Sequence, residues 1–138
     1  MTRDRARSVQ RVVHPTREIT PAVKILMILN DSPYGTERTY NGLRLALSLA
    51  KAEGTELRVF LMGDAVAAAK PGQTTPAGYY NLERMLRGCA TKEVLVGACG
   101  TCMDARGFVD ADLVAGALRS SMAELTTWTI WADKVITF

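Results

Sequence analysis

The amino-acid sequence predicts an α/β protein, a three-layer α/β/α sandwich built around a mostly parallel sheet. Short apolar runs alternate along the chain with stretches whose apolar residues recur at helical spacing. The links between them are short, as expected where helices cross over between parallel strands. The first run is continuously apolar rather than alternating, which indicates a strand buried on both faces.

Four segments are predicted as strands. Residues 23–30 are apolar, apart from Lys24, until the turn cluster Asn-Asp-Ser-Pro begins, so they are expected to form a buried parallel strand. Residues 57–62 and 94–98 are similar short apolar runs, and residues 134–138 close the chain as a last strand.

The first two helices are predicted between these strands. From about Glu37, apolar residues recur at steps of three and four, and Gly54 ends this pattern. Asp64 can cap a short alanine-rich helix that Pro71 terminates.

Three further helices are predicted in the second half of the chain. A third helix face begins at Leu82. Asp110 can cap a fourth helix, whose core face consists of apolar residues at helical spacing: Leu113, Val114, Ala117 and Leu118. Ser121 and Glu124 form a capping-box pattern, which opens a last helix that ends near Trp131.

The charge distribution divides the chain into a basic extension and a neutral body. Residues 1–22 contain five arginines and two acidic residues, and so carry all of the formal charge of +3. They are expected to be a flexible or docked extension, and residues 23–138 a single domain. The neutral body predicts no nucleic-acid partner. No apolar run approaches the roughly 20 residues that span a bilayer, so no membrane partner is expected, and the absence of a secretory signal favours the cytoplasm.

Chemistry in parallel sheets gathers beyond the carboxyl ends of the strands. Three loops leave those ends here: residues 31–36, residues 63–64 with their neighbours, and residues 99–107. Aspartates in these loops could hold a metal or act as bases, although such residues more often cap turns and helices: Asp31, Asp64 and Asp104.

Cys99 and Cys102 have C-x-x-C spacing directly after the third predicted strand. This spacing allows the two sulfurs to pair, to share a metal or to exchange a proton. Turn N–H groups and cations stabilise a thiolate, and Arg106 is near enough in sequence to be that cation. Gly100 allows the backbone N–H groups to face a sulfur or an anion. We therefore expect an ionised Cys99 with a depressed pKa.

Other interpretations of the cysteines stay open. Structural zinc needs four ligands, and one C-x-x-C supplies two with no core histidine to help. A structural disulfide is unfavourable in a reducing compartment, and buried cysteines are often incidental. Cys89 lies on the apolar face of Met85 and Leu86, and is interpreted as a packing residue. Neither a metal nor another cofactor is predicted.

Four segments resemble the DsrE/DsrF-like family, and its YchN-like branch in particular: SPYGT at 32–36, FLMGDAV at 60–66, the 99–107 loop with C-x-T-C ahead of Arg-Gly, and the ending at 132–138. The resemblance extends from about residue 23 to the end of the chain. It implies a Rossmann-like α/β/α fold assembled into trimers or hexamers. It also implies a link to sulfur-relay proteins, in which a cysteine before an Arg-Gly pair carries sulfane sulfur as a persulfide. The matching residue is Cys99, seven positions before Arg106.

The predicted function is that of a sulfur-relay protein, which would make the chain a sulfurtransferase with sulfur-donor and sulfur-acceptor proteins as partners. In this hypothesis the Cys99 thiolate attacks the donor and Cys102 resolves the persulfide. Arg106 stabilises the anion, and Tyr34 shapes the entrance with the loop at 70–79. Two alternatives stay open. One is a dithiol–disulfide redox protein that uses the same cysteines, and the other is a non-catalytic oligomeric binding or scaffold protein.

Overall fold

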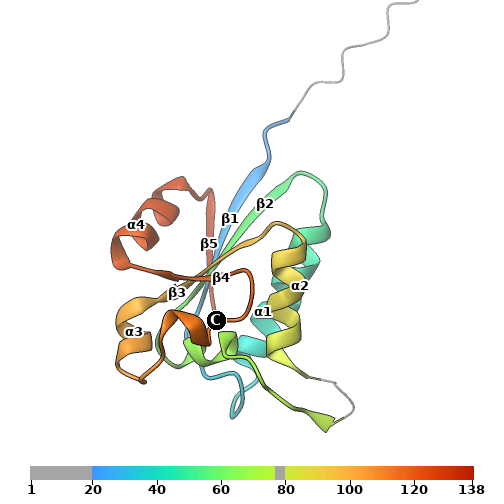
Figure 1. The fold of residues 1–138 in the computed structure, drawn as a ribbon. Coiled ribbons are helices and arrows are strands. Elements are labelled where there is room, and N and C mark those ends of the chain that lie inside the picture. The colour runs from blue at the N-terminus through green and yellow to red at the C-terminus, as the bar shows by residue number, and fades with distance from the viewer. Residues whose placement is uncertain (1–19, 77–79) are drawn as a thin grey trace, which may run out of the picture.

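The computed structural model describes residues 20–76 and 80–138, which form one five-stranded sheet in the order β4-β3-β2-β1-β5 (Figure 1). Every neighbouring pair of strands is parallel. The strands are β1 (Val23–Leu29), β2 (Thr55–Leu61), β3 (Leu95–Cys99), β4 (Ala117–Ser120) and β5 (Lys134–Thr137). The predicted α/β fold is therefore confirmed. Most of the predicted basic extension lies outside the described residues.

Helices cover the two faces of the sheet unequally. Figure 1 shows two helices side by side on one face and a third on the opposite face. These are α1 (Arg38–Lys51) and α2 (Leu82–Thr91) on the first face, and α4 (Met122–Trp131) on the other. Short helical segments in the connections of the described chain include η1 (Gly63–Ala69), α3 (Gly100–Asp104) and η3 (Asp110–Asp112). Within the described residues, no helix is long and apolar enough to cross a bilayer.

Side-chain caps explain where two of the long helices begin. Asn81 precedes α2, and its side-chain oxygen accepts a hydrogen bond from the Arg84 N–H at 3.0 Å. Ser121 precedes α4 and accepts from the Glu124 N–H at 3.2 Å. The capping box predicted there is present in half, because the Glu124 carboxylate accepts the Ser120 hydroxyl instead.

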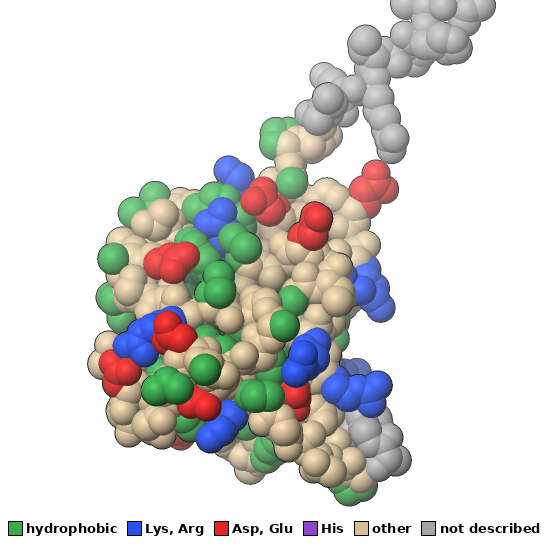
Figure 2. Space-filling view, in the orientation of Figure 1, with side chains coloured by type: hydrophobic (Ala, Val, Ile, Leu, Met, Phe, Trp, Pro, Cys, Tyr) green, Lys and Arg blue, Asp and Glu red, His purple; other side chains and the backbone are tan. Residues whose placement is uncertain are grey.

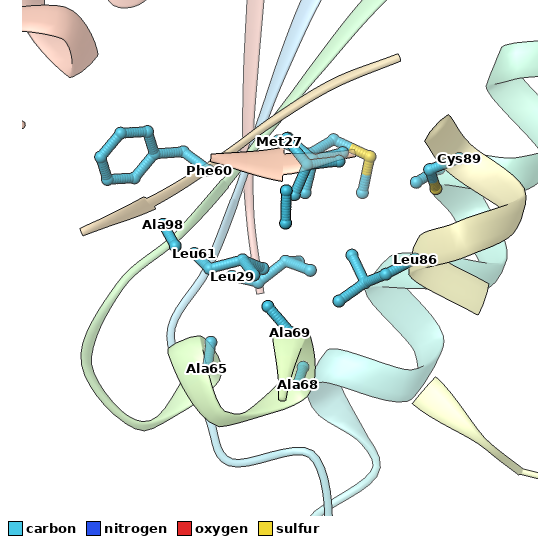
Figure 3. Packing of buried hydrophobic residues seen from close by; sticks show 14 of the residues in the cluster. Met27, Leu29, Phe60, Leu61, Ala65, Ala68, Ala69, Leu86, Cys89 and Ala98 are labelled. Carbon is cyan, nitrogen blue, oxygen red and sulfur yellow. The ribbon is translucent and has the colours of Figure 1, made fainter. Parts of the chain in front are cut away.

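The core lies on both faces of β1, β2 and β3. In Figure 3, Leu86 and Cys89 of α2 face the strands, and Phe60 points the other way. Cys89 has no exposed surface. Burial raises the pKa of its thiol to about 11, against a small lowering by Lys92. The interpretation of Cys89 as a packing residue is confirmed.

The fourth predicted helix is wrong. Residues 110–112 form only the 3-10 turn η3, and the chain then enters β4 at Ala117. Gly116 has a left-handed backbone with φ of +93°, which a continuous helix does not accommodate. Pairing with β3 satisfies the β4 backbone, and this tertiary contact overrides the local apolar spacing. Leu118, assigned to the core face of that helix, is 69% exposed.

The capping role predicted for Asp64 is also wrong. The residue before η1 is Met62, and Asp64 lies inside the first turn without a capping hydrogen bond. Its carboxylate is bound by Arg106 instead.

Candidate functional site

The candidate site lies at the carboxyl end of β3, where the strand runs directly into α3. Cys99 is the last residue of β3 and lies opposite Ser120 of β4. Two of the three predicted strand-end loops meet here. The N–H of Gly63, which follows β2, donates to the Cys102 sulfur at 3.1 Å. Arg106 forms an ion pair with Asp64 at 2.6 Å.

The two cysteines of the motif are free thiols in contrasting environments. Cys99 caps α3, and its sulfur accepts a hydrogen bond from the Cys102 N–H at 3.4 Å. The Cys99 residue is 7% exposed, whereas Cys102, one turn along α3, is half-buried. The Cys99 sulfur therefore accepts a hydrogen bond from the Cys102 N–H, and the Cys102 sulfur accepts one from the Gly63 N–H.

The environment of Cys99 opposes ionisation. Burial raises the pKa of its thiol, and the neighbouring Cys102 side chain raises it further through a shared hydrogen bond and charge repulsion. The backbone N–H groups of Cys102 and Thr101 offset only part of this effect. The depressed pKa expected at Cys99 is therefore wrong. The turn supplies the expected N–H groups, but it also removes the Cys99 sulfur from water, and the loss of water has the larger effect on the pKa.

Arg106 lies in the site, but its charge is paired with a carboxylate. Its Nε and Nη2 atoms donate to Oδ1 of Asp64 at 3.0 and 2.6 Å. Its Nη1 atom donates to the backbone carbonyl of Cys102 at 2.9 Å. Arg106 thus links the loop after β2 to α3 and fixes the position of Cys102.

Sequence reasoning missed Arg119, which lies over the start of α3. A Cβ atom added to Gly100 would stand 2.9 Å from Nε of Arg119 and 3.0 Å from the Ser120 carbonyl oxygen. Gly100 therefore lets β4 and this arginine approach Cys99 closely. Arg119 was missed because it fell within the incorrectly predicted helix. The signal for its placement is a short strand, Ala-Leu-Arg-Ser, between a glycine and a helix N-cap.

Two aspartates hold Arg119 in place. Its Nη2 atom donates to Oδ2 of Asp104 at 2.7 Å, and Nη1 lies 3.7 Å from Oδ1 of Asp110. The hydrogen bond to Arg119 lowers the pKa of Asp104. The same bond is the main cause of a raised pKa of Arg119. Charge attraction from Cys99 is the smallest of the contributions that raise this pKa. Asp104, a predicted site residue, is thus a partner of Arg119.

Tyr34 belongs to a neighbouring network rather than to the cysteine pair. Its hydroxyl donates to Oε1 of Gln73 at 2.6 Å and accepts from the Leu82 N–H at 3.4 Å. Burial acts to raise the pKa of Glu83, but the Gln73 N–H and other hydrogen bonds outweigh it and lower that pKa. Tyr34 does contact the 70–79 loop, of which residues 77–79 lie outside the described residues. Asp31 contacts Thr36 and Arg38, away from both cysteines.

Metal ligands do not gather in this site. Over residues 20–76 and 80–138, no three His, Cys, Asp or Glu side chains are placed to hold an ion.

The structure is that of a small α/β/α protein: a parallel sheet has helices on both faces, and a C-x-x-C pair of free cysteines begins where its third strand ends. The model of the DsrE/DsrF-like family matches residues 23–138, and the chain belongs to this family. It is similar to protein YchN of Escherichia coli K12, with 43% identity over 116 residues, which are 83% of this chain and 98% of YchN. The predicted YchN-like resemblance is therefore confirmed.

A second relative agrees with this assignment, and solved structures share the fold. The crystal structure of YchN from Escherichia coli matches with a TM-score of 0.79, over 84% of this chain and 99% of that one. An uncharacterised protein of Methanopyrus kandleri is 38% identical over 114 residues, which are 83% of this chain and 93% of the relative. A protein of unknown function from Methanobacterium thermoautotrophicum shares the fold, with a TM-score of 0.64 at 15% identity over 85% of this chain and 99% of that one.

Proposed function

We propose that this protein is a sulfur-relay protein that carries sulfane sulfur as a persulfide on Cys99 and passes it to an acceptor thiol. The observation that carries the proposal is the pair of free thiols at the end of β3, each accepting a backbone N–H. Membership of the DsrE/DsrF-like family, which is related to sulfur-relay proteins, supports the same chemistry. The free thiols suit a reducing compartment, and we place the protein in the cytoplasm.

Uptake and release are two thiol exchanges with no net oxidation. A cysteine thiolate of the protein attacks the outer sulfur of a donor persulfide, the donor S–S bond breaks, and the donor leaves as a thiolate. In release, the acceptor thiolate attacks the outer sulfur of the persulfide, the S–S bond of the persulfide breaks, and the cysteine of the protein leaves as a thiolate. The low exposure of Cys99 suits a carrier, because it shields the stored sulfur from small thiols in solution.

The same geometry also fits the alternative of a dithiol–disulfide redox protein. The thiols of Cys99 and Cys102 share a hydrogen bond, so a dithiol–disulfide couple is within their reach. The two functions differ in the mass of the product: persulfide formation adds sulfur, whereas disulfide formation removes two hydrogen atoms.

Incubation of the reduced protein with inorganic polysulfide is expected to add one sulfur atom per chain, as measured by intact mass after removal of the donor. In the folded protein the added sulfur should resist small thiols, because Cys99 is 7% exposed. Once the protein is unfolded, dithiothreitol should remove it, because an accessible persulfide is reducible. Cys89→Ser is the matched control and should load like the wild type, since Cys89 lies in the core.

A folded Cys99→Ser variant should keep no added sulfur after treatment with small thiols, because the variant lacks the buried thiol that stores the sulfur in the wild type. Loss of two hydrogen atoms without added sulfur would favour the redox alternative. An unchanged mass would favour the scaffold alternative and overturn the relay.

We also propose that the chain assembles into a homotrimer or homohexamer. Helix α4 carries apolar side chains on its exposed side as well as on its buried side, and Figure 2 shows hydrophobic side chains over α4 and the neighbouring strand edge. Leu118, Met122 and Ile130 are 69%, 61% and 81% exposed, which is unfavourable for a monomer in water. A second copy of this chain is the partner that would cover these side chains.

Light scattering is expected to give three or six times the chain mass for the wild type. The double variant Leu118→Glu/Ile130→Glu should run at a lower mass, because charges replace apolar side chains in the interface. Lys51→Glu, on the opposite face of the sheet, is the control and should leave the assembly intact. A wild-type protein of monomer mass at micromolar concentration would contradict the proposal.

A further inference from the structure

We propose that Cys102 is the thiol that takes sulfur from the donor, and that Cys99 receives the sulfur from Cys102 and stores it. This order of events rests on the sulfur-relay function proposed above. It reverses the order expected from the sequence and its family resemblance, in which Cys99 attacks the donor and Cys102 acts only afterwards.

Access distinguishes the two sulfurs. Thiol exchange needs the attacking sulfur to approach the sulfur–sulfur bond of the donor, so a bulky donor reaches only an accessible thiol. Cys102 is half-buried on the outer part of α3, whereas Cys99 is 7% exposed at the end of a sheet strand. A donor on another protein therefore meets Cys102 first.

The loop after β2 holds Cys102 at two points. Gly63 donates its N–H to the Cys102 sulfur at 3.1 Å. The next residue, Asp64, binds Arg106, and Arg106 donates to the Cys102 carbonyl at 2.9 Å. A hydrogen bond from a backbone N–H fixes the position of the sulfur that accepts it, so the Gly63 contact holds the Cys102 sulfur in place for exchange with a donor. Within the described chain, the N–H donors to the Cys99 sulfur come from the first turn of α3, and none comes from another loop.

The two sulfurs are placed for an internal transfer. The Cys102 N–H donates to the Cys99 sulfur at 3.4 Å, and the two side chains share a hydrogen bond. In the transfer, the Cys99 sulfur attacks the outer sulfur of the Cys102 persulfide and the Cys102 S–S bond breaks. Cys102 takes up the proton that Cys99 releases. The products are a Cys99 persulfide and a Cys102 thiol, so atoms, electrons and the proton balance without an oxidant or reductant.

The experiment follows loading site by site. Wild type, Cys99→Ser, Cys102→Ser and the control Cys89→Ser are pulsed with inorganic polysulfide, quenched with an alkylating agent, and mapped by peptide mass spectrometry. Cys99→Ser is expected to gain sulfur on Cys102 at the wild-type rate. Cys102→Ser is expected to load Cys99 about tenfold more slowly or worse, because the buried thiol is seldom ionised or reached.

Loading of Cys99 at the wild-type rate in Cys102→Ser would overturn the order of events and leave the relay function standing. Failure of the wild type to gain sulfur would overturn both proposals. A measurement on the unmodified wild type guards against variants that fold poorly. Limiting alkylation near neutral pH should label Cys102 about tenfold faster than Cys99. Labelling of Cys99 should increase as the pH rises towards its raised pKa. Faster labelling of Cys99 near neutral pH would overturn the proposal.

Discussion

Replacing Phe60 by alanine is expected to lower the free energy of unfolding by about 3–5 kcal/mol. Phe60 lies in the central strand β2 and is 1% exposed. Its ring meets the Trp128 ring of α4 edge to face, with the centroids 6.0 Å apart at an interplanar angle of 90°. Alanine would leave a cavity between the sheet and the only long helix on that face of the described chain. Urea denaturation followed by circular dichroism measures the loss.

Phe108→Ala is the matched control for this experiment. Phe108 is half-buried beyond α3, where it packs beside the Lys70 ammonium at 4.7 Å. Its replacement should cost less than about 2 kcal/mol, because less apolar surface returns to water. A Phe60→Ala variant as stable as Phe108→Ala would mean that α4 does not pack on the sheet as described.

Four of the five strands could be predicted, because each of them depends on a local apolar run. The apolar runs at 23–30 and 94–98 are bounded by turn residues, so the strands they form can be predicted without knowledge of tertiary contacts. A parallel sheet then brings the strand ends to one edge, and the C-x-x-C pair follows the third run directly. The contact between the loops at 63–64 and 99–107 follows from that topology.

The electrostatics of the site could not be predicted in the same way. Sequence distance made Arg106 the cation expected beside Cys99, but Asp64, 42 positions earlier, binds its guanidinium. The pKa of Cys99 depends on how much water its sulfur loses, which only the packing of β3 against its neighbours decides. Arg119 reaches the site through the pairing of β4 with β3, a long-range contact that apolar spacing does not reveal.

The Gly116→Ala variant distinguishes the predicted helix from the observed strand, because the two structures predict changes of opposite sign in the free energy of unfolding. In a helix over residues 110–120, replacing a glycine by alanine would add about 1 kcal/mol of stability. In the structure, Gly116 has φ of +93°, and its new Cβ would collide with the Cβ of Ala90 in α2. We expect a loss on the order of 2–5 kcal/mol, from backbone strain together with overpacking.

Gly54→Ala isolates the backbone part of this loss. Gly54 has a similar φ of +79°, but no atom lies within 4 Å of an added Cβ. Its replacement should cost about 1 kcal/mol, so the difference between the two variants measures the collision with Ala90. Thermal and urea unfolding of both variants would give that difference. A Gly116→Ala variant more stable than the wild type would favour the predicted helix over β4. It would also contradict the position of Arg119 beside Cys99.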